Sequence, residues 1–96
     1  MTSMVLVRVN NHIRLRTVEY IDIEDDIAYY LDVDKSLISI FDKKTGRNVC
    51  NLMSSSTKEE ILDAYKIYKP KIEKVRKSKQ YDSMIYLFNS LTKGIE

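Results

Sequence analysis

Residues 51–60, NLMSSSTKEE, divide the chain into two halves with different apolar patterns. Before this segment, short apolar runs alternate with polar residues and turn formers, as they do in antiparallel strands. After it, apolar residues recur every three or four positions, as on one face of a helix. Ser56 and Glu59 fit a capping box, in which a hydroxyl and a carboxylate satisfy backbone amides at the start of a helix. The segment therefore predicts that the strands end here and a helix begins.

The first half, residues 4–52, indicates an antiparallel meander of about five strands. Its apolar runs are VLVRV, IRLRTVEYIDI, IAYYLDV, SLISIF and RNVCNL, separated by NNH, EDD, DK and DKKTG. The separators are rich in Asn and Asp, which tolerate the left-handed backbone of tight turns. We expect these strands to form one sheet with one apolar inner face.

Two hairpin registers follow if the apolar side chains share that inner face. The first hairpin is expected to turn through residues 10–12, pairing Val5 with Thr17, Val7 with Leu15 and Val9 with Ile13. This register places Arg8 opposite Arg14, with Arg16 on the same outer face. The second hairpin is expected to turn at residues 34–35, pairing Val33 with Ser36, Leu31 with Ile38 and Tyr29 with Ile40. The expected inner face includes Val5, Val7, Val9, Ile13, Leu15, Leu31 and Ile40.

The second half predicts two or three helices packed on one face of the sheet. The first carries an apolar stripe made of Ile61, Tyr65, Tyr68, Ile72 and Val75. Pro70 has no amide hydrogen, so it is expected either to kink this helix or to begin a new one. A last helix, about 80–92, is expected to end near Gly94 and carries Tyr81, Met84, Ile85, Phe88 and Leu91 on one face. Strands followed by helices indicate an α+β fold.

Composition limits the class of protein. The chain has 96 residues, 44% of them hydrophobic, with two Gly, one Pro and a formal net charge of +2, so we expect a single domain spanning residues 1–96. No apolar run approaches the roughly 18 residues of a membrane span, and Arg8 lies too early for a secretory signal. Together with the single cysteine, Cys50, these features predict a cytoplasmic protein that does not bind membranes.

No catalytic or cofactor-binding signature is present in the sequence. Cys50 and the only histidine, His12, lie in different segments and do not predict a nucleophile paired with a base. Two glycines cannot form a glycine-rich phosphate loop. The acidic groups at residues 24–26 and 32–34 coincide with expected turns more than with a set of cation ligands. We therefore expect a non-enzymatic binding module with no cofactor, no metal and no small-molecule substrate.

Residues 66–79, KIYKPKIEKVRKSK, concentrate positive charge in a nearly neutral chain. One acid, Glu73, offsets seven basic residues, which are Lys66, Lys69, Lys71, Lys74, Arg76, Lys77 and Lys79. Such a helix binds phosphates without sequence preference, and Arg8, Arg14 and Arg16 are expected to assist because Arg presents a planar donor fork. These ten residues are the predicted nucleic-acid-binding surface. Two other interpretations stay open: a solvated helix surface, and neutralisation of the arginines by Glu19 or Asp32.

An acidic block between residues 19 and 34 raises an alternative function. It contains no Lys or Arg, and its acids are Glu19, Asp22, Glu24, Asp25, Asp26, Asp32 and Asp34. If this block met the basic segment of a second copy, the protein would be a homodimer with complementary charges. The apolar residues 81–88 exceed what covers one sheet face and favour a protein-interaction module. One form of this alternative is an accessory or host-directed factor from a virus or other mobile element. The composition, rich in Lys, Ile, Asn and Tyr, indicates AT-rich DNA, which fits a mobile element, a low-GC bacterium or a crenarchaeon, and it does not identify a function.

Overall fold

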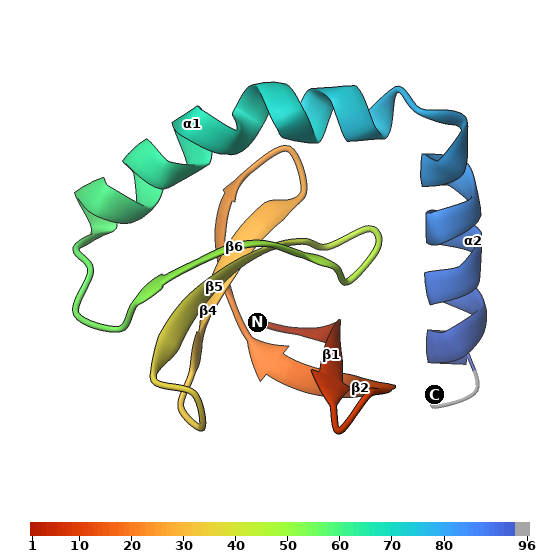
Figure 1. The fold of residues 1–96 in the computed structure, drawn as a ribbon, viewed down its shortest axis with the longest axis horizontal. Coiled ribbons are helices and arrows are strands. Elements are labelled where there is room, and N and C mark those ends of the chain that lie inside the picture. The colour runs from red at the N-terminus through yellow and green to blue at the C-terminus, as the bar shows by residue number, and fades with distance from the viewer. Residues whose placement is uncertain (94–96) are drawn as a thin grey trace.

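A computed structural model describes residues 1–93, apart from the side chains of residues 8 and 9. The strands in this range are β1 (Thr2–Val9), β2 (His12–Glu19), β3 (Ile21–Glu24), β4 (Ile27–Asp32), β5 (Leu37–Asp42) and β6 (Asn48–Met53). Two helices follow, α1 (Lys58–Arg76) and α2 (Lys79–Lys93) (Figure 1). The expected α+β class is therefore confirmed, and the expected helix end near Gly94 lies outside the described residues.

The strands form two sheets where a single meander was expected. β1 and β2 form an antiparallel hairpin, and the others form a four-stranded antiparallel sheet in the order β3-β4-β5-β6. Only Tyr20 separates β2 from β3, and no turn former marks this change of sheet in the sequence. Figure 1 shows α1 crossing one side of the four-stranded sheet while the hairpin lies on the other side. The sheet is thus covered on both faces.

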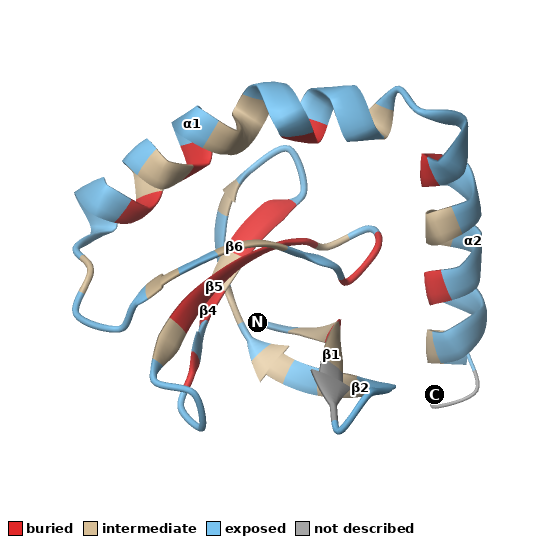
Figure 2. Ribbon diagram, in the orientation of Figure 1, coloured by how far each residue is buried: buried red, intermediate tan, exposed pale blue. Residues whose placement is uncertain are grey.

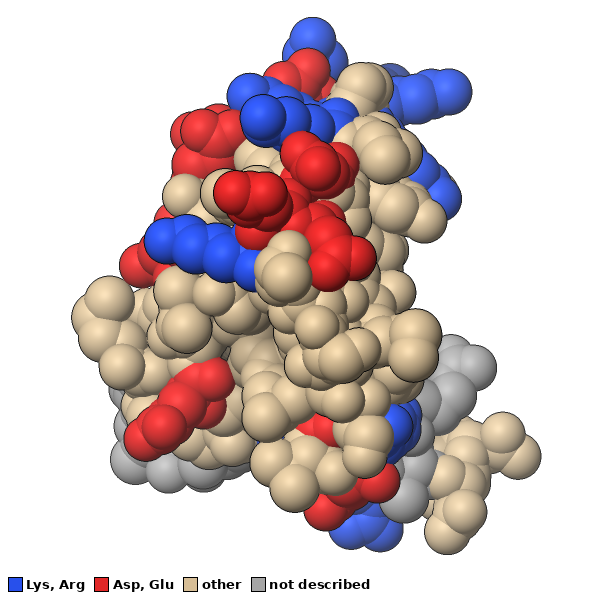
Figure 3. Space-filling model, turned by 90° about the vertical axis from the view of Figure 1, so that its left-hand side faces the viewer, with Lys and Arg blue, Asp and Glu red and all other residues tan. Residues whose placement is uncertain are grey.

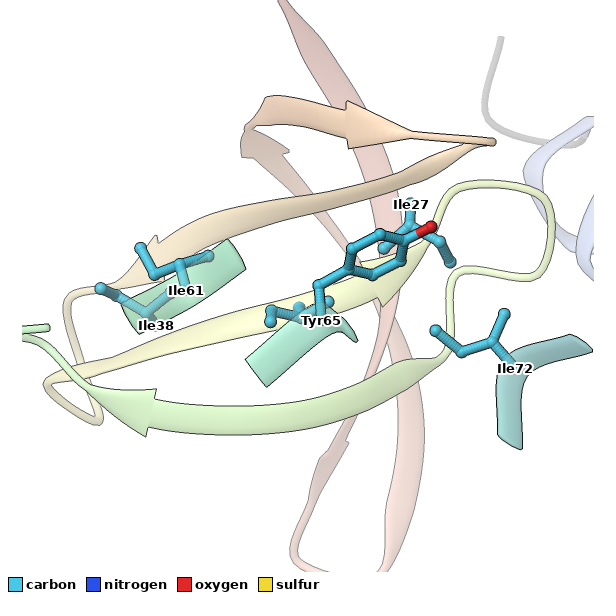
Figure 4. Packing of buried hydrophobic residues seen from close by; sticks show 6 residues of the cluster. Ile27, Ile38, Ile61, Tyr65 and Ile72 are labelled. Atoms are coloured by element: carbon cyan, nitrogen blue, oxygen red, sulfur yellow. The ribbon is translucent and has the colours of Figure 1, made fainter. Parts of the chain in front are cut away.

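Each face of the four-stranded sheet buries its own apolar cluster. The cluster under α1 contains Ile27, Ile38, Ile40, Ile61, Tyr65 and Ile72, and Figure 4 shows how the helix and sheet residues meet. The cluster under the hairpin contains Val5, Ala28, Tyr30 and Phe41. The Phe41 ring meets those of Tyr20 and Tyr30 edge to face, with centroids 6.2 and 5.5 Å apart. Buried residues accordingly concentrate in the two central strands, β4 and β5 (Figure 2).

The first hairpin has a different register from the expected one. Asn10 and Asn11, with φ of 49° and 66°, form a two-residue turn, and His12 already belongs to β2. Consecutive left-handed residues favour this short turn because its twist matches that of the strands. Val5 therefore faces Arg16, Val7 faces Arg14 and Arg8 faces Ile13. The predicted pairing of Arg8 with Arg14 is wrong.

The second hairpin has the predicted register, with Leu31 opposite Ile38 and Tyr29 opposite Ile40. The expected single inner face is not formed, because Val5 is buried in the cluster under the hairpin and Ile40 in the cluster under α1, on opposite faces of the four-stranded sheet. Val7 and Leu15 are half-buried, and the side chain of Val9 lies outside the described residues. Ile13 and Leu31 remain 61% and 55% exposed, so their assignment to the core is wrong. The shifted register turns Ile13 to the opposite face of the hairpin from Val5. Pairing with β3 stops at Tyr29, which leaves Leu31 without a neighbouring strand on that side.

Helix α1 begins with a capping box one residue later than predicted. The Thr57 hydroxyl accepts a hydrogen bond from the Glu60 amide at 3.2 Å, and the Glu60 carboxylate accepts one from the Thr57 amide at 2.9 Å. Ser56 is held in the preceding turn, where its amide donates to the Met53 carbonyl at 2.9 Å. Pro70 is exposed and lies inside α1, and the break between helices falls at residues 77–78 instead.

Helix α2 packs on the loop between β5 and β6, and the prediction that all helices pack on one sheet face is therefore wrong for α2. Its buried residues are Tyr81 and Phe88, and Phe88 lies against Gly46. Gly46 has a φ of +68°, and its carbonyl accepts a hydrogen bond from the Leu6 amide at 2.7 Å. One loop residue therefore joins the hairpin, the four-stranded sheet and α2.

Replacing Gly46 with Ala should lower the free energy of unfolding by more than about 1 kcal/mol, since a left-handed conformation costs an L-residue about 1–2 kcal/mol. A Cβ would also overlap the Phe88 ring, with two ring atoms at 2.9 Å. Equilibrium urea unfolding measures the change. The same substitution should cost less in a Phe88→Leu background, and equal costs in both backgrounds would show that the ring does not pack on this loop.

Candidate functional site

In the acidic block, residues 19–34, five of the seven acids form ion pairs, mainly with cations of the strands and their connections. The pairs are Asp22 with Lys43 at 2.5 Å, Asp26 with Lys44 at 3.6 Å, and Arg16 with Asp32 at 3.5 Å and Asp34 at 2.8 Å. Within the part of the chain that the structure describes, its one ion pair to the helices joins Glu24 to Lys69 at 3.2 Å. The block therefore does not cover the basic segment.

The predicted arginine cluster is not assembled on a surface facing the helices. Arg16 forms ion pairs with Asp34 and Asp32, and Asp32 is only 3% exposed. Removing Arg16 would leave that buried charge without its cation. Arg14 is exposed on β2, in the hairpin on the other side of the sheet from α1. The side chain of Arg8 lies outside the described residues.

Two of the seven basic residues in the 66–79 segment form ion pairs with acids of the sheet. Lys69 pairs with Glu24, and this hydrogen bond raises the pKa of Lys69. Hydrogen bonds from Tyr65 and Lys69 lower the pKa of Glu24. Arg76 lies 3.4 Å from Asp42, with its guanidinium 6.0 Å from the centre of the Tyr81 ring. These two cations are therefore already neutralised within the molecule.

Asp42 is a buried acid at the point where both helices meet β5. The Tyr81 hydroxyl donates to Asp42 Oδ2 at 2.6 Å, and the Lys44 amide donates to Oδ1 at 2.9 Å. Arg76 supplies the opposite charge from the end of α1. Burial and the hydrogen bond to Asp42 raise the pKa of Tyr81 to about 12. One carboxylate thus fixes the last turn of α1 and the first turn of α2 against the sheet.

The other five basic residues of the segment are exposed and make no ion pair with any described residue: Lys66, Lys71, Lys74, Lys77 and Lys79. Helical spacing puts Lys66, Lys74 and Lys77 on the side of α1 away from its buried residues. They span about 16 Å at 1.5 Å per residue. Lys71 lies on the flank of α1 and Lys79 begins α2. We call these five residues the lysine surface.

The first turns of α1 differ in charge from the lysine surface. Glu59, Glu60 and Asp63 are exposed there beside Lys58. Figure 3 views the molecule from this end and shows basic and acidic side chains interleaved above a broad uncharged area. The later part of α1 and the start of α2 are more basic, since Glu73 is the one acid of residues 66–79.

The sequence did not distinguish the two structural cations from the lysine surface, although a signal was present. Lys69 and Arg76 each follow a buried residue of the α1 stripe, Tyr65 and Ile72, by four positions. Residues four apart lie on one side of a helix, so both cations flank the stripe and can reach acids of the sheet. Asp42 was missed because a single acid ending a strand has no distinctive pattern.

Comparisons with known proteins found no match to the chain among protein-family models, curated proteins or solved structures. In the described part of the chain, no three His, Cys, Asp or Glu side chains are grouped to hold a metal ion. Neither α1 nor α2 has the length and apolar character needed to cross a membrane. Cys50 is half-buried in β6, and burial raises the pKa of its thiol.

Replacing Tyr81 with Phe should lower the free energy of unfolding by about 1–3 kcal/mol, because buried Asp42 loses a hydrogen-bond donor. Tyr86→Phe removes the same hydroxyl from a side chain on the same helix that is 76% exposed. It should change stability by less than about 0.5 kcal/mol. Chemical denaturation of both variants tests the role of Asp42, and equal effects would contradict it.

Alkaline pH should destabilise the fold, most strongly through two tyrosines. Burial and hydrogen bonds to Glu24 and Asp42 raise the pKa values of Tyr65 and Tyr81 from 10.0 to about 12. Their contribution to stability is complete below pH 10 and is lost as the pH rises from 10 to 12. In a titration of tyrosinate absorbance, these two of the seven tyrosines should ionise last. Tyr81→Phe should remove one late group, and an unchanged curve would contradict the assignment.

Proposed function

We propose that the protein is a non-enzymatic module that binds nucleic acid through the lysine surface. The supporting observation is the distribution of charge: five of the seven acids of the acidic block pair with Arg16, Lys43, Lys44 or Lys69, whereas the five lysines of the surface make no ion pair with a described residue. Clustered cations attract phosphates because binding releases the counterions that phosphates hold. This distribution favours nucleic acid over a simple solvated helix.

The expected contact is with the phosphate backbone of a duplex, without base readout. The surface consists of lysines, which act as point charges and carry no planar group for stacking. Single-strand binding surfaces usually add exposed aromatic rings on which bases stack. The nearest ring of the α1 stripe, Tyr68, is half-buried. Compared with the ten residues predicted from the sequence, the proposed site leaves out Lys69, Arg76 and the three arginines.

Charge reversal of Lys71, Lys74 and Lys77 to Glu should abolish binding of a mixed-sequence DNA duplex, because phosphates would then meet carboxylates. A matched control reverses Lys35, Lys58 and Lys93, which are exposed elsewhere and change the net charge equally. Fluorescence anisotropy across a salt series measures both. For the unmodified protein, the slope of log K against log salt should indicate about four released counterions.

Either of two results would contradict the proposal. The first is duplex binding that survives reversal of Lys71, Lys74 and Lys77. The second is an equal loss of binding in both triple variants, because binding would then depend on net charge and not on the lysine surface. Circular dichroism and cooperative unfolding of each variant confirm that the fold is retained.

The second candidate is a protein-interaction module or homodimer. Leu87 and Leu91 of α2 are 50% and 42% exposed and lie one turn apart on the same side of the helix. Exposed apolar residues grouped in this way are typical of interfaces. Sedimentation of the protein used for the DNA experiment distinguishes the candidates: a dimer without DNA binding would favour this one.

A further inference from the structure

A cavity of about 200 Å³ lies between the later part of α1, the start of α2 and the connection from β5 to β6. Figure 1 shows this connection extending toward α2 beneath the end of α1. Three separate parts of the chain therefore form its walls. Its volume is below the roughly 300–1,000 Å³ of typical small-molecule and cofactor sites, so it has room only for a small ligand.

The walls of the cavity are mainly apolar. Ile72 and Val75 come from α1, Met84 from α2 and Val49 from β6. Met is flexible and adapts its shape to different apolar groups. A hydrocarbon group in this cavity would leave water and contact all three elements at once.

The polar groups around the cavity favour a negative ligand. Arg47 and Lys71 line it, are exposed, and make no ion pair with a residue in the described range. The one acid among the lining residues is Asp42, which Arg76 already neutralises and Tyr81 hydrogen-bonds. Asn48 donates its side-chain amide to Asn51 at 2.7 Å. Two cations without partners thus border an apolar cavity.

We propose that this cavity binds a small carboxylate with a short hydrocarbon chain. The chain lies against Ile72, Val75, Met84 and Val49, and the carboxylate lies between Arg47 and Lys71. The proposal goes beyond nucleic-acid binding and does not depend on it, since the two sites share only Lys71.

Octanoate, octylamine and butyrate are the probes, with binding followed by chemical shifts of backbone amides. Octanoate should bind at residues 71–75 and 47–49, whereas octylamine, of equal chain length and opposite charge, should not. Within the series from butyrate to octanoate, each added methylene should tighten binding about fourfold until the cavity is full. Equal binding of octanoate and octylamine would show that the cations take no part.

Lys71→Gln and Lys74→Gln form a matched pair, because both lysines belong to the lysine surface but only Lys71 lines the cavity. Lys71→Gln should weaken octanoate binding roughly fivefold, as expected for one exposed ion pair, and Lys74→Gln should leave it unchanged. Val75→Phe, which places a larger side chain in the cavity, should abolish it.

Duplex DNA binding by the same variants separates this proposal from the proposed function. Both glutamine variants should weaken DNA binding alike, whereas octanoate binding should respond only to Lys71→Gln. Equal effects of the two variants on octanoate, or no octanoate binding at millimolar concentration, would overturn the carboxylate site. Absence of DNA binding would overturn the nucleic-acid proposal alone.

Discussion

The four-stranded sheet has two apolar faces, and the rest of the fold depends on covering both of them. Ile27, Ile38 and Ile40 point to one side, and Ala28, Tyr30 and Phe41 to the other. Burial of apolar surface is the main favourable contribution to folding, so neither face can be left in water. Helix α1 covers the first and the β1–β2 hairpin covers the second. This requirement explains why the chain changes sheets at Tyr20.

The same layering separates the charges. Acids on β3 and β4 lie close to the cations of neighbouring strands and connections, and they are neutralised there. Helix α1 lies above the sheet, so only the cations flanking its buried stripe reach an acid: Lys69 reaches Glu24 and Arg76 reaches Asp42. Lysines farther around the helix make no ion pair with a described residue, although Glu73 lies one turn before Lys77. A nearly neutral chain therefore carries a basic surface in which five unpaired lysines outnumber the one acid of the same segment, Glu73.

The sequence predicted features that depend on neighbouring residues and missed those that depend on distant ones. Periodicity located both helices and the β4–β5 register, because each follows from residues close in the chain. The division into two sheets was missed because the run IRLRTVEYIDI contains no turn former, and Tyr20, where the chain changes sheets, packs on the distant Phe41. The segment containing the lysine surface was identified by composition. The sequence does not show which cations of this segment lack a partner, because that depends on residues far apart in the chain. Lys69 and Glu24, for example, are 45 positions apart.

Pro70 has a consequence for how the lysine surface can hold a ligand. Without an amide hydrogen, it cannot donate to the carbonyl four residues earlier, which belongs to Lys66. That carbonyl oxygen carries partial negative charge on the outer side of α1, among the lysines, and it repels phosphate oxygens. Phosphates would therefore be held on either side of Pro70, with Lys66 as one anchor and Lys71, Lys74, Lys77 and Lys79 as the other. The lysine surface is thus divided into two phosphate-binding groups, one with a single lysine and one with four. A ligand too short to reach both groups would bind to the group of four.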